Sequence, residues 1–339
     1  MQTVHQEISN FLFGSPPRNQ TLQMMSRLHL QYAYPASGQA QRERSWQITE
    51  QIVRNHQHRD GVTLFIDYRQ ESKLHQEVDA WFDEPYKPVF RASRFDTYGL
   101  AHLLPLNPLK AAPIEDLLDY YEVRFGKSKS TDGPQKAFLE TLATRLREQG
   151  EELSFPLLSQ AAIDESWATA AQLGTSEDTL AQLRKETQFG CGLSHNLSFG
   201  RDAGHGKKQE PIDVFELLRK NQSVFLNLSR GGDEELSRLL LADLGVQWAA
   251  AKAEGTWMPE LLIVLCGGGW MPSERYIGVT QPRLKRCGIG LHHLTDAYTT
   301  RSHYEQMYDL GWVVGAFPDF DNANIFELRN EDGVRRIDV

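Results

Sequence analysis

Glu260-Leu-Leu-Ile-Val-Leu-Cys-Gly-Gly-Gly269 is the stretch of sequence that decides the fold. Five branched apolar residues in a row, closed by glycines, predict a short strand that is buried on both faces. Similar apolar runs occur at residues 61–67, 223–228 and 288–295, and helical patterns lie between them. This alternation predicts an α/β protein with a mostly parallel sheet that helices flank.

The strand signals stop between residues 114 and 184. Helical patterns replace them at residues 114–125, 135–149, 157–173 and 177–185. We interpret this block as an all-α domain inserted into the α/β core. The predicted division is a core of residues 1–112 and 222–339, and an insertion of residues 113–221 with a flexible loop near 190–210.

Composition and charge indicate a soluble protein of the reducing cytoplasm. The 339 residues are 40% hydrophobic and 24% charged, which is ordinary for a globular chain. The net charge of −9 does not favour a general nucleic-acid binder. Three widely spaced cysteines do not form a disulfide framework, and no export signal or membrane-spanning run is visible.

A vestigial phosphate-binding loop is predicted near the N-terminus, at Gly14-Ser-Pro-Pro-Arg-Asn-Gln-Thr21. In the pattern G-x-x-x-x-G-K-[ST], Gly14 and Thr21 fit the outer positions. Asn19 replaces the second glycine, and the neutral Gln20 replaces the lysine that binds the β- and γ-phosphates. The residues of this site are Gly14, Ser15, Asn19, Gln20 and Thr21. The same letters also suit an ordinary turn.

The surroundings of this loop favour the phosphate-loop interpretation. An apolar run at residues 8–13 predicts a strand before it. After it, Leu22, Met25, Leu28 and Tyr32 recur at helical spacing, which predicts the helix that follows a phosphate loop.

The order of the segments along the chain resembles that of the type IV coupling proteins, the TraD/TraG-like branch of the HerA–FtsK motor ATPases. The matching segments are the Gly14–Thr21 loop, Phe65-Ile-Asp-Tyr-Arg69, Pro105-Leu-Asn-Pro-Leu109, the helical block, Val224–Ser229, Leu261–Gly267 and Cys287-Gly-Ile-Gly-Leu-His-His-Leu-Thr-Asp296. The resemblance implies a P-loop core of the RecA/HerA–FtsK type with an inserted all-α domain.

The chain departs from the family at each site that would handle a nucleotide. The family's Walker B strand ends in two acids, for Mg²⁺ and for the attacking water, where this chain has Cys266 and Gly267. A glutamine that senses the γ-phosphate would follow Thr295, but Asp296 stands there and would repel a phosphate. The resemblance therefore implies a pseudo-ATPase, for which we expect neither ATP nor Mg²⁺ as a cofactor.

For such a chain the resemblance implies a scaffold, adaptor or regulator in a conjugation or secretion complex. Its partners would be proteins, such as an active coupling ATPase or secretion substrates, with DNA contact as a weaker alternative. We expect a cytoplasmic protein that a partner recruits to the inner membrane. Trp270 and Met271 form a candidate docking surface, and Arg283, Arg286 and Arg301 are candidates for an arginine donated to a neighbouring subunit.

Several other patterns carry weaker hypotheses. Asp67, Glu71 and Lys73 suggest a metal-dependent nuclease, although three intervening residues leave no room for the turn between strands that such a site needs. The glycines and lysines of residues 200–208 favour a basic surface loop over a second phosphate loop. Cys191, His195 and His205 are residue types that bind zinc, but their spacing matches no compact zinc site. His292 and His293 cannot act as a pair, because a strand would direct their side chains to opposite faces.

Overall fold

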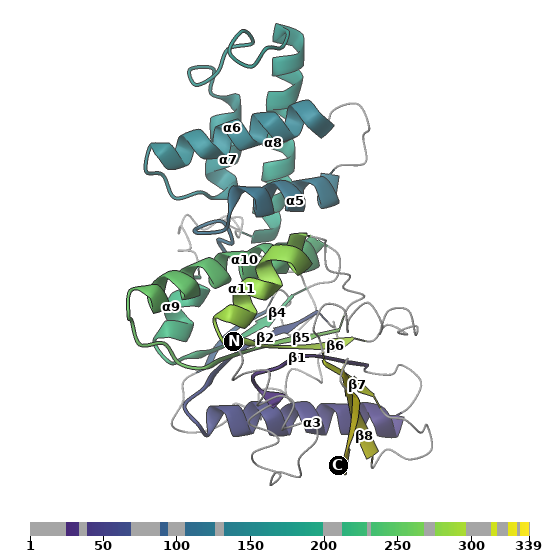
Figure 1. Cartoon of the computed structure of the whole chain (residues 1–339). Coiled ribbons are helices and arrows are strands. Elements are labelled where there is room, and N and C mark those ends of the chain that lie inside the picture. The colour runs from purple at the N-terminus through teal and green to yellow at the C-terminus, as the bar shows by residue number, and fades with distance from the viewer. Residues whose placement is uncertain are drawn as a thin grey trace.

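Figure 1 shows the computed structural model of the chain. It describes residues 25–33, 39–68, 89–93, 106–125, 132–198, 212–228, 232–267, 275–295, 313–316, 325–330 and 333–338.

The described residues form one nine-stranded sheet with the order β3-β4-β2-β5-β6-β1-β7-β8-β9. The strands from β3 to β7 in this order are all parallel to their neighbours, and the β8–β9 hairpin adds two antiparallel strands at one edge. The bounds are β1 His29–Ala33, β2 Val62–Asp67, β3 Val89–Ser93, β4 Ser223–Asn227, β5 Leu261–Cys266, β6 Gly290–Thr295, β7 Val313–Ala316, β8 Ile325–Asn330 and β9 Gly333–Asp338.

Helices cover both faces of the sheet. In Figure 1, α3 (Gln39–Gln57) lies on one face, and α9 (Val214–Arg219), α10 (Gly232–Ala253) and α11 (Gln281–Arg286) lie on the other. A short π-helix, η1 (Tyr276–Thr280), leads directly into α11. The predicted mostly parallel sheet between helices is therefore confirmed.

The all-α insertion stands on α10, on the side away from the sheet (Figure 1). It contains α5 (Ile114–Phe125), α6 (Asp132–Glu148), α7 (Phe155–Ile163) and α8 (Glu177–Ser198). Helix α7 begins where the side chain of Ser154 accepts a hydrogen bond from the Leu157 N–H, with a proline at the start of the helix. The chain enters and leaves beside the bridge between Leu106 and Ile212.

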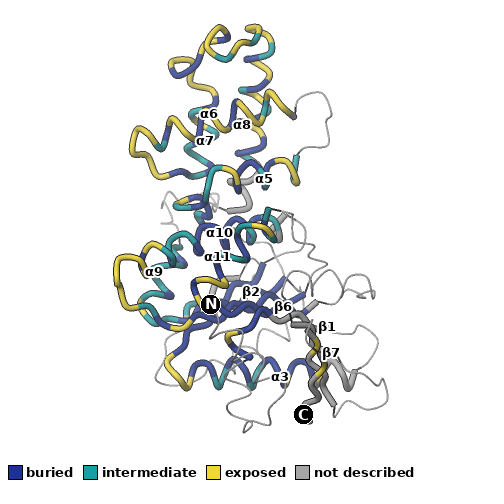
Figure 2. Tube along the Cα trace, viewed as in Figure 1, coloured by how far each residue is buried: buried dark blue, intermediate teal, exposed yellow. Residues whose placement is uncertain are grey.

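Two hydrophobic clusters, one for each part of the chain, hold the structure together (Figure 2). Every residue of β5 is buried, as a strand in the middle of a parallel sheet requires. Trp248 of α10 packs with the sheet and meets Phe215 of α9 edge to face, at 6.1 Å between ring centroids. In the insertion, Phe138 of α6 packs against Trp167 at 5.0 Å.

The Gly-Ile-Gly segment before β6 has a structural explanation. Gly288 has a φ of +70°, a conformation that L side chains rarely adopt. A Cβ atom on Gly290 would lie 1.9 Å from the backbone oxygen of Ser26, because the chain that leads into β1 crosses close to this point. Both glycines therefore serve the packing of β6 beside β1.

The boundary at the end of the insertion differs from the predicted one. Val214 and Leu218 of α9 pack in the cluster of the sheet, so this helix belongs to the core although it lies before residue 222. Helix α8 continues to Ser198, into the region predicted as a flexible loop. The long helix predicted for residues 157–173 ends at Ile163.

The N-terminal part of the core also differs from the prediction. The sequence predicted a helix over residues 22–32, and this prediction is wrong for the last turn. His29–Ala33 form β1, which lies between β6 and β7 in the sheet. Pairing with two strands outweighs a helical pattern of four apolar residues. Helix α3 was not predicted, and neither was β9, whose charged residues gave no strand signal.

Candidate functional site

The crevice between the carboxyl ends of β1 and β6 is the candidate functional site. From β1 the chain crosses to β2, past β6 and β5, whereas from β6 it crosses in the other direction to β7. Connections that leave neighbouring parallel strands in opposite directions open a crevice where α/β proteins bind ligands. Ala33 and Thr295 are register partners at this point.

The connection from β1 to α3 has the strand–loop–helix order of a phosphate-binding unit. Its sequence, Ala33-Tyr-Pro-Ala-Ser-Gly-Gln-Ala40, can be aligned with G-x-x-x-x-G-K-[ST]. Gly38 then fits the second glycine, while Gln39 replaces the lysine and Ala40 replaces the hydroxyl residue. Only the register of β1 reveals this alignment, since a single matching glycine is no sequence signal. The predicted loop from Gly14 to Thr21 lies outside the described residues and stays a prediction.

The end of β5 lies next to this crevice. Cys266 is the last residue of the strand, pairs with Leu294 of β6, and has a side chain that is buried. Gly267 follows with a φ of +80°, and its N–H donates to the Leu294 carbonyl at 2.9 Å. The end of β5 therefore presents a buried thiol and a glycine beside the crevice.

A row of polar residues continues from Cys266 across the same edge of the sheet. Asp67 of β2 pairs with Cys266 on one side and with Asn227 of β4 on the other. All three side chains are buried. They face α3, since Phe65, two residues before Asp67, meets Trp46 of that helix edge to face at 6.3 Å. At this edge of the sheet the described carboxylate is therefore that of Asp67, at the end of β2, the strand that neighbours β5.

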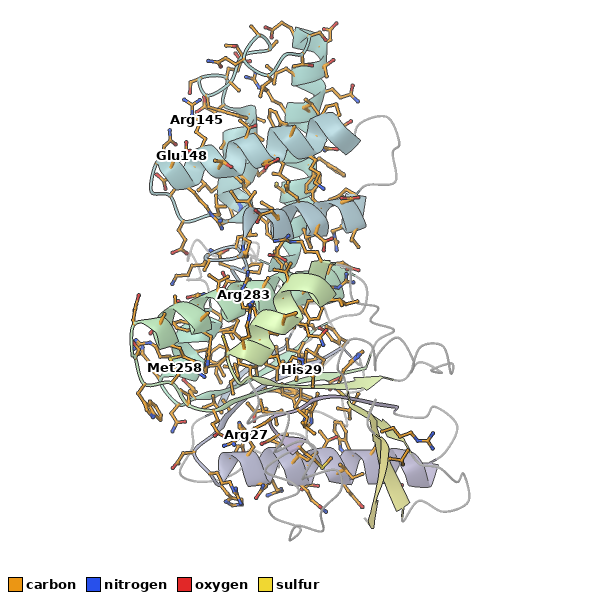
Figure 3. All side chains as sticks on the ribbon, viewed as in Figure 1. Arg27, His29, Arg145, Glu148, Met258 and Arg283 are labelled. Atoms are coloured by element: carbon orange, nitrogen blue, oxygen red, sulfur yellow. The ribbon has the colours of Figure 1, made fainter. Side chains whose placement is uncertain are left out.

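The structure separates the predicted arginines. Arg283 is half-buried between α11 and α10, and its Cδ would lie 3.5 Å from a Cβ atom on Gly245 (Figure 3). Arg286 is exposed in the last turn of α11. Of the two, Arg286 is the one whose position suits a contact with a neighbouring subunit. Arg301 lies outside the described residues, as do Asp296, Trp270 and Met271.

The histidines of the sheet are core residues. His292 and His293 are both buried, and His292 Nε2 lies 2.6 Å from the Met25 carbonyl oxygen. His29 of β1 is buried as well, with Nε2 3.2 Å from the Ile289 carbonyl oxygen. Burial lowers the pKa of His29 to about 3 and that of His292 to about 4, so both rings are neutral at pH 7.

The described residues give the zinc hypothesis no support, and of the three residues of the nuclease hypothesis they contain only Asp67. Cys191 is buried inside the insertion, and burial raises the pKa of its thiol to about 12, which disfavours the thiolate that binds zinc. Among the described residues, no three His, Cys, Asp or Glu side chains come together in a way that could hold a metal ion. His205, Glu71 and Lys73 lie outside the described residues.

A cavity of about 240 Å³ lies where the insertion joins the core. Asp243 of α10 lines it, and its carboxylate accepts hydrogen bonds from the N–H groups of Ala111 and Ala112. Burial raises the pKa of Asp243 to about 6. Across the cavity, Lys110 pairs with Asp213 at 2.8 Å. These contacts fix the chain at the entry to the insertion and at its exit.

Comparison with known proteins identifies the fold. No family model and no curated protein matches the sequence. Among solved structures, the bacterial conjugative coupling protein TrwBdeltaN70 in its trigonal form with sulphate superposes with a TM-score of 0.53 and 8% identity, over 92% of this chain and 78% of that one. Its unbound monoclinic form gives 0.51 and 10%, over 92% and 77%.

The chain has the fold of the conjugative coupling proteins. The α/β P-loop fold with a mostly parallel sheet, which the resemblance implied, is thereby confirmed. The sequence identity to these structures is only 8–10%, so the likeness shows the fold and does not transfer functional residues. The functional sites of this chain must be argued from its own geometry. Within the described residues, no helix is long and apolar enough to cross a membrane.

Proposed function

We propose that this chain is a catalytically inactive relative of the type IV coupling ATPases and acts as a scaffold, adaptor or regulator in a conjugation or secretion complex. The coupling-protein fold supports the class of complex. The described residues at the end of β5 support the loss of activity, because Cys266 and Gly267 cannot supply the carboxylates with which such a motor hydrolyses ATP.

The end of β5 is the observation that carries this proposal. Hydrolysis of ATP by a motor of this fold needs a carboxylate there to organise Mg²⁺ and another to polarise water. Cys266 offers a buried thiol instead, and Gly267 offers no side chain. In the alignment of the β1–α3 connection, Gln39 and Ala40 replace the lysine and the hydroxyl residue, so a positive charge and an Mg²⁺ ligand are missing from that pattern.

Nucleotide titration with matched variants tests the inactivity. We expect neither calorimetric binding of ATP with Mg²⁺ nor hydrolysis by the purified chain. The double variant Gln39→Lys/Ala40→Thr restores the pattern at the β1–α3 connection and should gain measurable ATP binding. The same exchange at the N-terminal loop, Gln20→Lys, is the control that tells the two loops apart. Hydrolysis by the unmodified chain would contradict the proposal.

The adaptor role predicts a protein partner. The chain would bind an active coupling ATPase or a secretion substrate at the cytoplasmic face of the membrane and would reach that face through the partner. The test is association of the purified chain with the purified coupling ATPase of its own host, measured by light scattering after size exclusion. Trp270→Ala/Met271→Ala should weaken a complex that uses this segment, and absence of any complex would refute the ATPase as partner.

A second candidate function is a divergent enzyme that acts on nucleotides or nucleic acids. Asp67 favours it, because this buried carboxylate stands at the same edge as the crevice and one strand from Cys266. Mg²⁺- or Mn²⁺-dependent cleavage of nucleic acid or ATP, lost in Asp67→Asn, would support this function. Equal rates for the chain and the variant would dispose of it.

A further inference from the structure

The segment that follows the β5 connection contains a rare π-helix. In η1 (Tyr276–Thr280) the N–H of Gln281 donates to the carbonyl of Tyr276, five residues back, before the chain continues as α11. π-helices are rare, occur mostly as single turns inside α-helices, and are frequent at functional sites.

Asp116 of the insertion contacts both ends of η1. Arg275, directly before η1, donates from Nη2 to Asp116 Oδ2 at 3.2 Å, and its Nε lies 3.2 Å from Oδ1. At the other end, Thr280 Oγ1 donates to Asp116 Oδ1 at 3.3 Å. Asp116 is only 7% exposed and lies on α5, which packs against α10 and so joins the insertion to the core.

These contacts depend on the π conformation. Hydrogen bonds that join residues five apart place such residues one above the other, so Arg275 and Thr280 face the same side. In an α-helix each residue turns by about 100°, and two residues five apart diverge by about 140°. A single carboxylate could then reach one of them but not both.

We propose that Asp116 is a clamp that holds η1 in the π form and thereby couples the position of the insertion to the carboxyl end of β5. Loss of the clamp frees both ends of η1, so the π-turn opens more often, and in the open state the Gln281 N–H loses its bond to the Tyr276 carbonyl. Helix α11 continues from η1 and leads into β6, where the Leu294 carbonyl accepts the Gly267 N–H, so opening of η1 acts on the end of β5 through described residues. The coupling is independent of whether the crevice binds nucleotide.

Glu115 provides a matched control for the clamp. Its Oε2 lies 3.5 Å from the same Arg275 Nη2, but its side chain is 63% exposed and makes no contact with Thr280 in the described structure. Glu115→Gln therefore removes a charge next to Arg275 without removing the clamp. Thr280→Val, in contrast, keeps the ion pair and the shape of the side chain and removes only the hydroxyl bond.

Hydrogen exchange of single amides tests the proposal. The Gln281 N–H reports the π-turn, and the Gly267 N–H, bonded to Leu294, reports the end of β5. We expect Asp116→Asn to speed exchange of both amides by about tenfold to a hundredfold, as loss of a buried charge-assisted pair implies. Thr280→Val should speed both by a smaller factor, and Glu115→Gln should change neither by more than about twofold.

Three results with Asp116→Asn in the otherwise unmodified chain would overturn the clamp. One is an unchanged Gln281 amide in Asp116→Asn, and another is a change at Gln281 without one at Gly267. The third is equal acceleration throughout β2, which would mean general destabilisation. Deletion of Gly278, whose Cβ position has free space around it, shortens the π-turn by one residue. In this variant Asp116→Asn should no longer alter the Gly267 amide, and a persisting effect would also refute the proposal.

Discussion

Acidification should destabilise the sheet through His29 and His292, which are buried as neutral rings. Their folded-state pKa values, about 3 and about 4, lie below the value of about 6.5 for an unfolded histidine. The unfolded chain therefore takes up protons first as the pH falls. The stability that the two neutral rings preserve is fully present above pH 6.5 and is lost as the pH decreases toward 4.

The size of this effect follows from proton linkage. Between pH 7 and pH 5 each ring costs about 1.9 kcal/mol of unfolding free energy, so the two together cost about 4 kcal/mol. Near pH 5 each contributes a slope of about 1.4 kcal/mol per pH unit. This is a large part of the 5–15 kcal/mol or so that a typical domain has in total.

Urea unfolding from pH 5 to pH 7, followed by tryptophan fluorescence, measures the slope. His29→Gln and His292→Gln each retain an N–H donor for the carbonyl that the ring contacts. Each variant should reduce the stability lost between pH 7 and pH 5 by about 1.9 kcal/mol relative to the unmodified chain, a mean change in slope of about 0.9 kcal/mol per pH unit, whatever the variant does to stability at pH 7. Comparison of slopes also removes the contributions of the carboxyl groups. Variants whose slope equals that of the unmodified chain would refute neutral burial of the rings.

Other expectations follow from single contacts. Asp243 should stabilise the folded chain on acidification, in contrast to the histidines, because its raised pKa of about 6 makes the folded chain take up a proton before the unfolded chain does. In the same urea titration, Asp243→Asn should therefore increase the loss of stability between pH 7 and pH 5 by about 1.3 kcal/mol. Gly290→Ala should cost about 3 kcal/mol or more in urea unfolding, because the added methyl group collides with the Ser26 backbone, whereas Gly278→Ala, with free space, should change stability by less than about 1 kcal/mol. Leu139→Ala, at a fully buried position of α6, should cost about 2–5 kcal/mol and increase exchange in the insertion while β2 stays protected.

The sequence by itself determined the α/β class and the order of its parts. The apolar run at Leu261–Cys266 and the shorter runs of β2, β4 and β6 could bury themselves only in the middle of a parallel sheet, because such residues leave no polar face for solvent. The insertion was visible for the same reason, since its apolar residues recur at helical spacing and α5 was predicted at its observed bounds. The sequence also shows without a structure that Cys266 and Gly267, and not acids, follow this apolar run.

Only the tertiary structure decided which segments meet. Neither β1 nor α3 carried a clear local signal, and only the pairing of β1 with β6 and β7 places the crevice beside the connection that leads from β1 to α3. The π form of η1 is equally invisible in sequence, because Asp116, about 160 residues earlier, stabilises it. Local patterns record how a segment buries its own side chains, whereas register and long-range ion pairs depend on partners that only folding brings into contact.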